Sequence, residues 1–307
     1  MESISLRAYG KINLGLDVTG TREDGYHLVR MVMQSVGIYD RVTITMTEEP
    51  GITLENSLRF LPAGPKNLAW RAADLLMREF AVPKGVHVAI DKHIPVAGGM
   101  AGGSSDAAAV LFGVNRLFGF NLTRKELMER GLKLGADVPF CLLRGTALAE
   151  GIGEILAPLP AMPDCFILIA KPSFSVSTRD VYTRLDGIMP PSGEERGRYF
   201  TEKLPDIDGL LGAIRAGNYE AMLPCMGNIL ENVTVPLHPE IAAIRGAMRE
   251  GGADAAMMSG SGPTVFGLFR EEEAAADTAA RLRAGRMAAQ IYVTRPYRPA
   301  RRRKHNA

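Results

Sequence analysis

Polar and apolar residues alternate near the start of the chain, a pattern typical of strands that bury one face. Such runs at 4–8, 12–18 and 42–46 predict that the chain begins with a sheet. Between the second and third runs, Glu23-Asp24-Gly25 is a turn signal. Tyr26 and His27, which come directly after it, are therefore expected to point into a cleft.

The next part of the chain has apolar residues at the spacing of a helix. Residues 68–80 form an amphipathic pattern that Asn67 can cap, and an alternating strand at 86–90 comes next. A glycine-rich loop then runs into a helix expected to begin at Ser104, a second helix is expected at 124–134, and 136–140 is predicted to be a fixed turn. The order strand, glycine loop, helix is the first indication of a binding site.

A glycine-rich stretch at 145–153 and a proline-rich one at 158–163 predict an exposed linker between two domains. Strands and helices mix again beyond it: a strand at 166–170, a surface loop at 190–198, helices at 207–216 and 239–249, strands at 255–258 and 264–269, and a last helix and strand ending at 293. We therefore predict an α+β chain with domains at 1–157 and 158–294 and a basic tail at 295–307.

Composition narrows the class of protein. With 307 residues, 46% of them hydrophobic, the chain can build two cores. It has no apolar stretch as long as a membrane span and does not begin like a secretory signal, so a cytoplasmic protein without a membrane partner is expected. The three cysteines and five histidines lack the spacing of a disulfide framework or a transition-metal site, so no metal ligand is predicted.

The net charge of +2 conceals an asymmetry. Six Lys and Arg residues lie in the segment 295–307, so the rest of the chain carries a formal charge of −4. A mildly acidic body is a poor surface for nucleic acid, and the tail is expected to be a solvated, mobile terminus. Binding of nucleic acid through this tail is the alternative.

The strongest chemical signal is Gly98-Gly99-Met100-Ala101-Gly102-Gly103-Ser104-Ser105. Four glycines let backbone N–H groups converge on one point, and the N-terminal end of the following helix adds partial positive charge. Ser104 stands where a Walker loop has lysine, so this is another kind of phosphate loop. The alternative is a glycine-rich turn capped by serine.

Three more segments accompany this loop: Lys11-Ile12-Asn13, Gly135-Ala136-Asp137-Val138-Pro139-Phe140 and Ser259-Gly260-Ser261-Gly262. In order and spacing the set resembles the three motifs of the GHMP kinase superfamily over nearly the whole chain. The segments KINLGLDVTGTREDGYH and MMSGSGPTVF resemble most the branch that phosphorylates a methylerythritol carrying cytidine diphosphate, in non-mevalonate isoprenoid synthesis. This implies an N-terminal domain like the second domain of ribosomal protein S5, a ferredoxin-like C-terminal domain, and a site for ATP and acceptor between them.

The resemblance also implies roles for two residues. Asp137 would be the base that takes the proton from the acceptor hydroxyl, with Lys11 as its cationic neighbour. A hydroxyl attacks a γ-phosphoryl group better as its proton leaves, and a nearby ammonium offsets negative charge in the transition state. Taken singly, each has a plainer interpretation, Asp137 as a turn residue and Lys11 as a surface charge.

The resemblance further implies two sets of binding residues. The ATP set comprises Pro95, Val96, Ala97, Gly98, Gly99, Met100, Ala101, Gly102, Gly103, Ser104 and Ser105, with Lys66, Asn67 and Lys92 on the adenosine side. The acceptor set comprises Asn13, Tyr26, His27, Thr178, Tyr182, Gly260 and Ser261. Tyr26 and Tyr182 could enclose the cytosine, but Tyr182 could equally be the buried face of a helix, Asn67 an ordinary N-cap and Gly260 part of a tight turn. Asp106 is expected to be structural.

ATP is the expected co-substrate, with Mg²⁺ held mainly by phosphate oxygens and water. The chain is expected to be a monomer or a weak homodimer. Two other functions stay open: a superfamily kinase for homoserine, mevalonate or a sugar, and a nucleotide sensor without catalysis.

Overall fold

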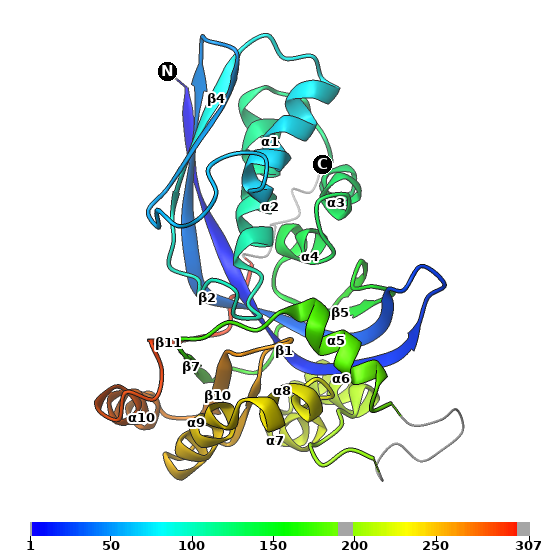
Figure 1. Cartoon of the computed structure of the whole chain (residues 1–307), viewed down its shortest axis with the longest axis vertical. Helices are drawn as coiled ribbons and strands as arrows, with labels where there is room; N and C mark the ends of the chain where they lie inside the picture. The colour runs from blue at the N-terminus through cyan, green and yellow to red at the C-terminus, as the bar shows by residue number, and fades with distance from the viewer. Residues whose placement is uncertain (1, 190–198, 300–307) are drawn as a thin grey trace.

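The computed structural model describes residues 2–189 and 199–299, and it has two α+β parts that meet at a cleft (Figure 1). The expected α+β class with two domains is confirmed. The predicted division at 157 and 158 falls at the last residue of β6 (Ile155–Pro158) and stays a prediction. The predicted loop at 190–198 lies outside the described residues.

The N-terminal sheet is built on two long antiparallel strands, β1 (Ser3–Thr21) and β2 (His27–Thr47). Its order is β3-β4-β2-β1-β8, with β5 on β2 and β6 on β5. The remaining strands are β3 (Gly51–Asn56), β4 (Gly85–Asp91), β5 (Thr146–Glu150) and β8 (Gly227–Asn228). The predicted opening strands are thus parts of two longer ones, joined at the predicted turn.

Helices cover one face of this sheet (Figure 1). They are α1 (Leu68–Glu79), α2 (Gly102–Leu117), α3 (Arg124–Leu132) and α4 (Val138–Leu143). Apolar residues of α1 and α2 pack on the sheet in one core that includes Ala72, Leu76, Val110 and Ile44. The Asn67 cap is confirmed, because its side chain accepts a hydrogen bond from the Ala69 N–H.

The C-terminal part has a four-stranded antiparallel sheet of order β11-β7-β10-β9. These strands are β7 (Phe166–Lys171), β9 (Ala255–Met258), β10 (Val265–Phe269) and β11 (Gln290–Thr294). The order, with helices after the first and third strands, is that of a ferredoxin-like unit. The helices are α5 (Thr178–Asp186), α6 (Ile207–Ala216), α7 (Tyr219–Met222), the 3₁₀ turn η2 (Leu223–Cys225), α8 (Glu231–Leu237), α9 (Pro239–Glu250) and α10 (Glu272–Ala284).

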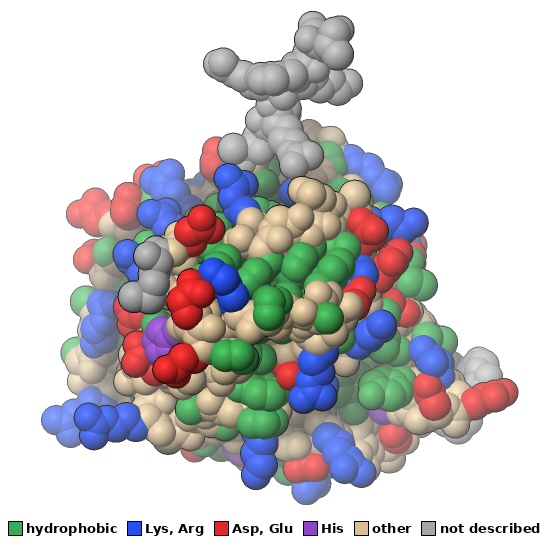
Figure 2. All heavy atoms as spheres, turned by 90° about the horizontal axis from the view of Figure 1, so that it is seen from above, with side chains coloured by type: hydrophobic (Ala, Val, Ile, Leu, Met, Phe, Trp, Pro, Cys, Tyr) green, Lys and Arg blue, Asp and Glu red, His purple; other side chains and the backbone are tan. Residues whose placement is uncertain are grey.

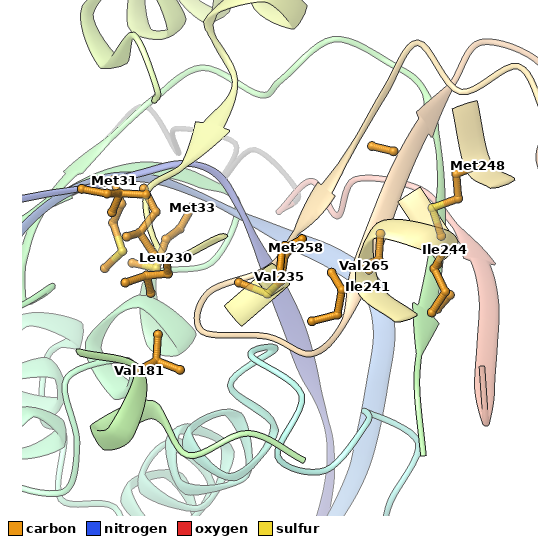
Figure 3. Close-up of a cluster of buried hydrophobic side chains, with 14 of the residues drawn as sticks. Met31, Met33, Val181, Leu230, Val235, Ile241, Ile244, Met248, Met258 and Val265 are labelled. Carbon is orange, nitrogen blue, oxygen red and sulfur yellow. The ribbon is translucent and has the colours of Figure 1, made fainter. Parts of the chain in front are cut away.

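Apolar packing joins the two parts. Met31 and Met33 of β2 lie in one buried cluster with Leu230, which directly precedes α8, and Met258 of β9 (Figure 3). A second cluster joins Ile12 and other residues of β1 and β2 to β7 and α6. Since burial of apolar side chains is the main stabilising contribution in folding, these contacts fix the two walls of the cleft relative to each other.

Three local predictions are wrong. The loop helix begins at Gly102 rather than Ser104, because Ala101 adopts a left-handed conformation (φ 57°) and caps the helix there. Residues 138–143 form α4 instead of a turn, since Pro139 occupies the first turn of a helix, where its missing N–H costs nothing. The stretch 145–153 contains β5, which is buried and paired with β2, so it is not an exposed linker.

The expected solvated tail is also wrong for residues 295–299. Pro296 bridges to Val36 of β2, and the ring of Tyr297 stacks on that of Tyr9. Residues 300–307 lie outside the described part of the chain. Within the described ranges, no helix has the length and apolar character of a membrane span.

Candidate active site

A cavity of about 1110 Å³ lies between the two parts of the molecule. Its walls come from β1, the glycine-rich loop, the start of α4, α5 and the loop after β9. Most predicted site residues line it: Lys11, Asn13, Tyr26, His27, Lys66, Asn67, Lys92, Pro95, Val96, Ala97, Gly98, Gly99, Ala101, Gly102, Gly103, Ser104, Asp137, Thr178, Tyr182, Gly260 and Ser261.

Lys11 and Asp137 both line this cavity, although 126 positions separate them in the chain. The Lys11 ammonium donates a hydrogen bond to Asn13 Oδ1 at 2.8 Å and is largely buried. Asp137 directly precedes α4, and its carboxylate makes no ion pair within the described residues. Burial raises the pKa of the Cys141 thiol to about 12, with a further rise from Asp137 and an opposing effect from Lys11, so both charges act on the same thiol.

The glycine-rich loop leads the backbone to the N-terminal end of α2. Gly99 has φ +75°, and a Cβ there would collide with the carbonyl oxygen of Ser259. A Cβ at Gly98 would come within 2.6 Å of Thr264 Oγ1. The first N–H groups of an α-helix have no partner inside the helix, so Gly102, Gly103 and Ser104 present donors and positive potential to the cavity.

Two residues predicted to bind ATP lie outside the cavity. The Met100 side chain is buried in the apolar core with Ile94. Its main-chain carbonyl accepts a hydrogen bond from the Lys11 N–H and so ties the loop to β1. The hydroxyl of Ser105 donates to the Tyr9 carbonyl at 2.6 Å, within the protein. Both point inward because the loop and the first turn of α2 must also attach to the core.

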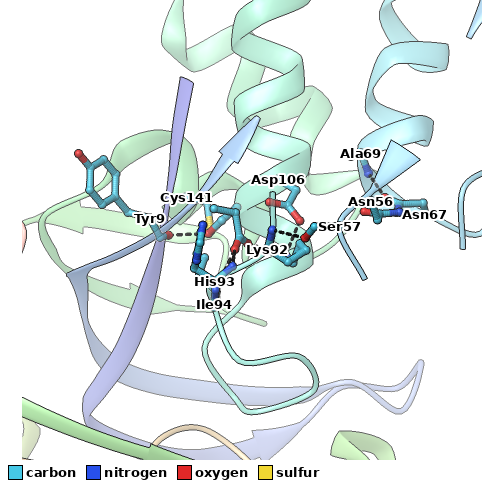
Figure 4. A network of polar contacts seen from close by, with 12 residues as sticks. Tyr9, Asn56, Ser57, Asn67, Ala69, Lys92, His93, Ile94, Asp106 and Cys141 are labelled. Atoms are coloured by element: carbon cyan, nitrogen blue, oxygen red, sulfur yellow. Dashed lines mark hydrogen bonds and ion pairs between the residues drawn. The ribbon is translucent and has the colours of Figure 1, made fainter. Parts of the chain in front are cut away.

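A buried charge cluster lies beneath the loop (Figure 4). The Lys92 ammonium pairs with Asp40 and, at 2.6 Å, with Asp106, and Asp40 also accepts the N–H groups of His93 and Ile94. Burial would lower the pKa of Lys92, but the two carboxylates raise it. Burial raises the pKa of Asp106 well above its ordinary range. Lys92 opposes this rise, but the nearby charge of Asp40 adds to it. The structural role expected for Asp106 fits this cluster, and an adenosine contact by Lys92 stays a prediction.

Lys66 and Asn67, predicted to contact adenosine, line the cavity together with Asn56, Leu61 and Pro62. The Asn67 amide is already used: its Oδ1 caps α1 and its Nδ2 donates to the Pro62 carbonyl at 2.9 Å. Asn56 also donates to Pro62, and its buried Oδ1 has no hydrogen-bond partner in the described part of the chain. An acceptor is thus available on this wall.

Aromatic residues gather at the other end. Tyr182 of α5 and His27 lie with ring centroids 4.7 Å apart, whereas Tyr26 is 60% exposed and makes no ring contact with Tyr182 within the described residues. Burial raises the pKa of the Tyr182 hydroxyl, and the charge of Asp137 adds to this rise, so Tyr182 lies within electrostatic reach of Asp137. Asp186 holds the imidazole of His27, with Nε2 and Oδ1 2.6 Å apart.

The loop after β9 closes the cavity floor. Ser261 and Thr178 share a hydrogen bond of 2.8 Å between their hydroxyls, which links this loop to α5. Asn228 of β8 donates to the carbonyls of Met258 and Gly260, and Ser259 donates to the carbonyl of Gly99. The loop is therefore a tight turn that also faces the cavity.

Sequence reasoning missed Asp186, Asn228 and the partners of Lys92. Asp186 lies 159 positions from His27, so nothing local pairs them. Asn228 follows Gly227 in a strand of two residues, too short to produce an alternating pattern. Asp40, in the second half of β2, resembles any solvent-facing strand residue until β4 brings Lys92 beside it.

Comparison with known proteins gives matches over the whole length. The family model for the GHMP kinase N-terminal domain matches residues 67–145, and that for the C-terminal domain matches 210–286. A 4-diphosphocytidyl-2-C-methyl-D-erythritol kinase of Lachnospira eligens is 51% identical over 97% of this chain and 100% of its own, and the protein of that name from Lachnoclostridium phytofermentans is 48% identical over 96% and 98%. A crystal structure of 4-(cytidine 5'-diphospho)-2C-methyl-D-erythritol kinase, 32% identical, superimposes with a TM-score of 0.79 over 96% of this chain and 100% of that one.

Proposed function

The chain belongs to the 4-diphosphocytidyl-2-C-methyl-D-erythritol kinases of the GHMP family, and from this premise we propose that Asp137 and Lys11 carry its reaction. The reaction is the transfer of the γ-phosphoryl group of ATP to the 2-hydroxyl of 4-diphosphocytidyl-2-C-methyl-D-erythritol, which gives the 2-phosphate and ADP in the methylerythritol phosphate route to isoprenoid precursors. It makes a P–O bond to the acceptor oxygen, breaks the bond between the γ-phosphorus and the bridging oxygen, and releases one proton.

Asp137 is proposed to accept that proton. Its carboxylate faces the cavity without an ion pair from the described residues, so its oxygens are available to a substrate hydroxyl. Lys11 is held by Asn13 and has further N–H groups for the phosphoryl oxygens. An ammonium at this place stabilises the negative charge that spreads over those oxygens during transfer.

The N–H groups of the glycine-rich loop and of the first turn of α2 are proposed to bind the triphosphate, with Lys66, Asn67 and Lys92 towards the adenosine. Mg²⁺ is proposed to accompany ATP, held mainly by phosphate oxygens and water. Of the nearby carboxylates, Asp106 lines the cavity and its Oδ1 has no hydrogen-bond partner among the described residues, whereas both oxygens of Asp40 are engaged by Lys92, His93 and Ile94. When bound, such an ion neutralises charge on the β- and γ-phosphates.

The acceptor is proposed to bind at the aromatic end. Tyr182 and Tyr26 offer stacking faces for cytosine, and Asn13, Thr178, Gly260 and Ser261 line the same cavity. If the Nε2–H of His27 donates to Asp186, Nδ1 is left as an acceptor for the cytosine amino group. The observation that carries the cytidine specificity is this His27, Tyr182 and Asp186 group at the end of the cavity that holds Asp137.

Competing acceptors test the specificity. ADP release should be measured with 4-diphosphocytidyl-2-C-methyl-D-erythritol, homoserine, mevalonate and galactose at equal concentrations. A reaction with ATP but without any acceptor is the blank. We expect turnover with the cytidine substrate and at most traces with the others. Equal or better turnover of homoserine or mevalonate would contradict the proposal, and ATP binding without turnover of any acceptor would favour a sensor.

We also propose that the reaction takes place in the cytoplasm, where its ATP is made, and that the chain acts as a monomer or a weak homodimer. Sedimentation of the purified chain over a range of concentrations tests the second point. A tight oligomer at the lowest concentration would contradict it.

A further inference from the structure

The segment 295–299, which follows the last strand, crosses from the C-terminal part onto β2. The Gly37 N–H donates to the Arg295 carbonyl at 2.9 Å, and the Tyr297 N–H donates to the Ser35 carbonyl at 2.8 Å. Arg298 donates to the Met162 carbonyl and pairs with Asp164 at 2.9 Å. None of the five residues 295–299 lines the cavity. We name residues 295–299 the C-terminal strap.

The strap contacts the residues of β2 that hold Lys11 in the sheet. Lys11 is paired with Ser35 and Ile12 with Gln34 in the register of β1 and β2. Tyr297 binds both of these partners: its N–H donates to the Ser35 carbonyl, and its own carbonyl accepts from Gln34 Nε2 at 3.1 Å. The register of β1 shifts between Tyr9 and Lys11, so the backbone is irregular just where the strap is attached.

The Tyr297 ring supports the same stretch from the other side. It stacks on the ring of Tyr9, with centroids 3.8 Å apart and planes at 25°. Tyr9 comes two residues before Lys11, and its carbonyl accepts the hydroxyl of Ser105 in the first turns of α2. The stack of Tyr297 on Tyr9 thus supports β1 next to Lys11 and, through Ser105, the helix α2 that follows the glycine-rich loop.

The element that carries Asp137 is attached to the same place. After α4 the chain reaches Gly145, whose carbonyl accepts the Ser35 N–H at 2.8 Å and whose N–H donates to Ser35 Oγ at 3.1 Å. The Thr146 hydroxyl donates to Gln34 Oε1 at 2.6 Å. Gln34 and Ser35 therefore join three segments: β1 with Lys11, the end of α4, and the strap.

We propose that Tyr297 is a positioning residue for the phosphoryl transfer, acting through Tyr9, Gln34 and Ser35 to fix Lys11 relative to Asp137. The inference rests on the proposed roles of these two residues. Transfer needs the ammonium and the carboxylate on the same phosphoryl group and hydroxyl, and a misplacement of about 1 Å can cost on the order of a hundredfold in rate. Binding of ATP and acceptor uses other walls of the cavity, so it depends much less on the strap.

The test compares steady-state kinetics of Tyr297→Ala, Tyr297→Leu and Tyr297→Phe in the full chain. For Tyr297→Ala we expect kcat to fall by about ten- to a hundredfold, while KM for ATP and for the cytidine substrate changes by less than about threefold. Tyr297→Leu, which keeps bulk but loses the ring stack, should fall between Ala and wild type. Tyr297→Phe should restore most of kcat, because the stack and both main-chain bonds remain.

Phe120→Ala is the matched control. It removes a stack of similar geometry, Phe80 on Phe120 with ring centroids 4.1 Å apart, and neither residue lines the cavity. Hydrophobic side chains lie among charged ones on the surface of this protein (Figure 2), so a change of one apolar side chain is not expected to disturb the site. This variant should lose thermal stability and keep kcat. Two truncations complete the set: ending the chain after Pro299 should leave kcat near wild type, and ending it after Thr294 should reproduce Tyr297→Ala.

All variants are assayed well below their own melting temperatures. The inference fails if folded Tyr297→Ala keeps the wild-type kcat, if Phe120→Ala loses kcat in the same proportion to its loss of stability, or if both KM values rise as much as kcat falls. A wild-type chain without turnover would instead refute the proposed function, so the two failures are distinguishable.

Discussion

The ring of Tyr182 lies against the imidazole of His27, with centroids 4.7 Å apart and planes inclined at 37°. Tyr182 comes from α5 in the second half of the chain, and His27 is the first residue of β2. The contact therefore forms only when the two parts of the molecule are assembled. The proposed recognition of cytosine by these rings therefore depends on the same interface that creates the cleft.

Replacement of Tyr182 tests this recognition. Stacking of a base on an aromatic ring contributes about 1–3 kcal/mol, so Tyr182→Leu should raise KM for the cytidine substrate by about five- to a hundredfold. KM for ATP should stay within about twofold, since other residues of the cavity, Lys66, Asn67 and Lys92, are proposed to contact the adenosine. Tyr182→Phe keeps the ring and serves as control. Equal changes in both KM values would mean that Tyr182 supports the fold rather than the base.

Asp137→Asn tests the proposed base. The amide has nearly the same shape but cannot take the proton, so kcat should fall by about 10²- to 10⁴-fold. ATP affinity, measured by calorimetry, should change by no more than a few fold, because the glycine-rich loop is the proposed site of the phosphates. Unchanged turnover in this variant would remove Asp137 from the mechanism.

Substitution of alanine at two glycines of the glycine-rich loop should have different effects. Gly99→Ala puts a Cβ into the Ser259 carbonyl at a positive φ, so we expect it to destabilise the protein by about 2 kcal/mol or more and to weaken ATP binding. At Gly103 a Cβ would meet only Leu68 Cδ1, at 3.8 Å. Gly103→Ala, which also favours the helix, should keep or raise the melting temperature. A similar loss in both variants would contradict this account of the loop.

Glu231 of α8 should make stability depend on pH. Burial raises its pKa from 4.5 to about 7, although Arg245 and the Met258 N–H favour its charged form. Between these values the folded chain keeps the proton and the unfolded chain releases it, so stability falls as the pH rises. The full effect, above about pH 7, corresponds to about 3 kcal/mol.

Glu231→Gln removes this dependence and keeps an acceptor for the Met258 N–H. The melting temperature of the variant minus that of the wild type should therefore rise from pH 4.5 to 7 and level off above it. A difference that is constant over this range would show that Glu231 does not titrate there.

The sequence predicted elements whose signal is local. Asn67 before an amphipathic run indicated α1 and its cap, and four glycines before a helical pattern indicated the loop that leads into α2. Local signals misled where the surroundings decide the conformation. Pro139 suggests a turn, but in the first turn of α4 it is compatible with a helix. The glycines at 145 and 151 suggest a linker, but four of the five residues between them, 146–149, pair with β2.

Nearly every site residue that the order of the motifs predicted does line the cavity, but the sequence did not indicate other lining residues such as Asn56, Arg179 and Asp186. It could not show which side chains were already engaged. Lys92 is committed to two carboxylates, and Ser105 to the Tyr9 carbonyl. Such partners come from strands and helices far apart in the chain, so only the assembled fold reveals them.

The shortest strand of the structure limits how this enzyme can be recombined with its relatives. Residues 227 and 228 leave the C-terminal part to pair in parallel with β1 at Gly15 and Leu16. A chimera that takes its first half from one parent and its second half from another, joined near residue 158, would therefore bring two unmatched sequences together inside a single sheet. Exchange of halves between distant homologues should give poorly folding proteins unless β8 and its partner positions travel as one block.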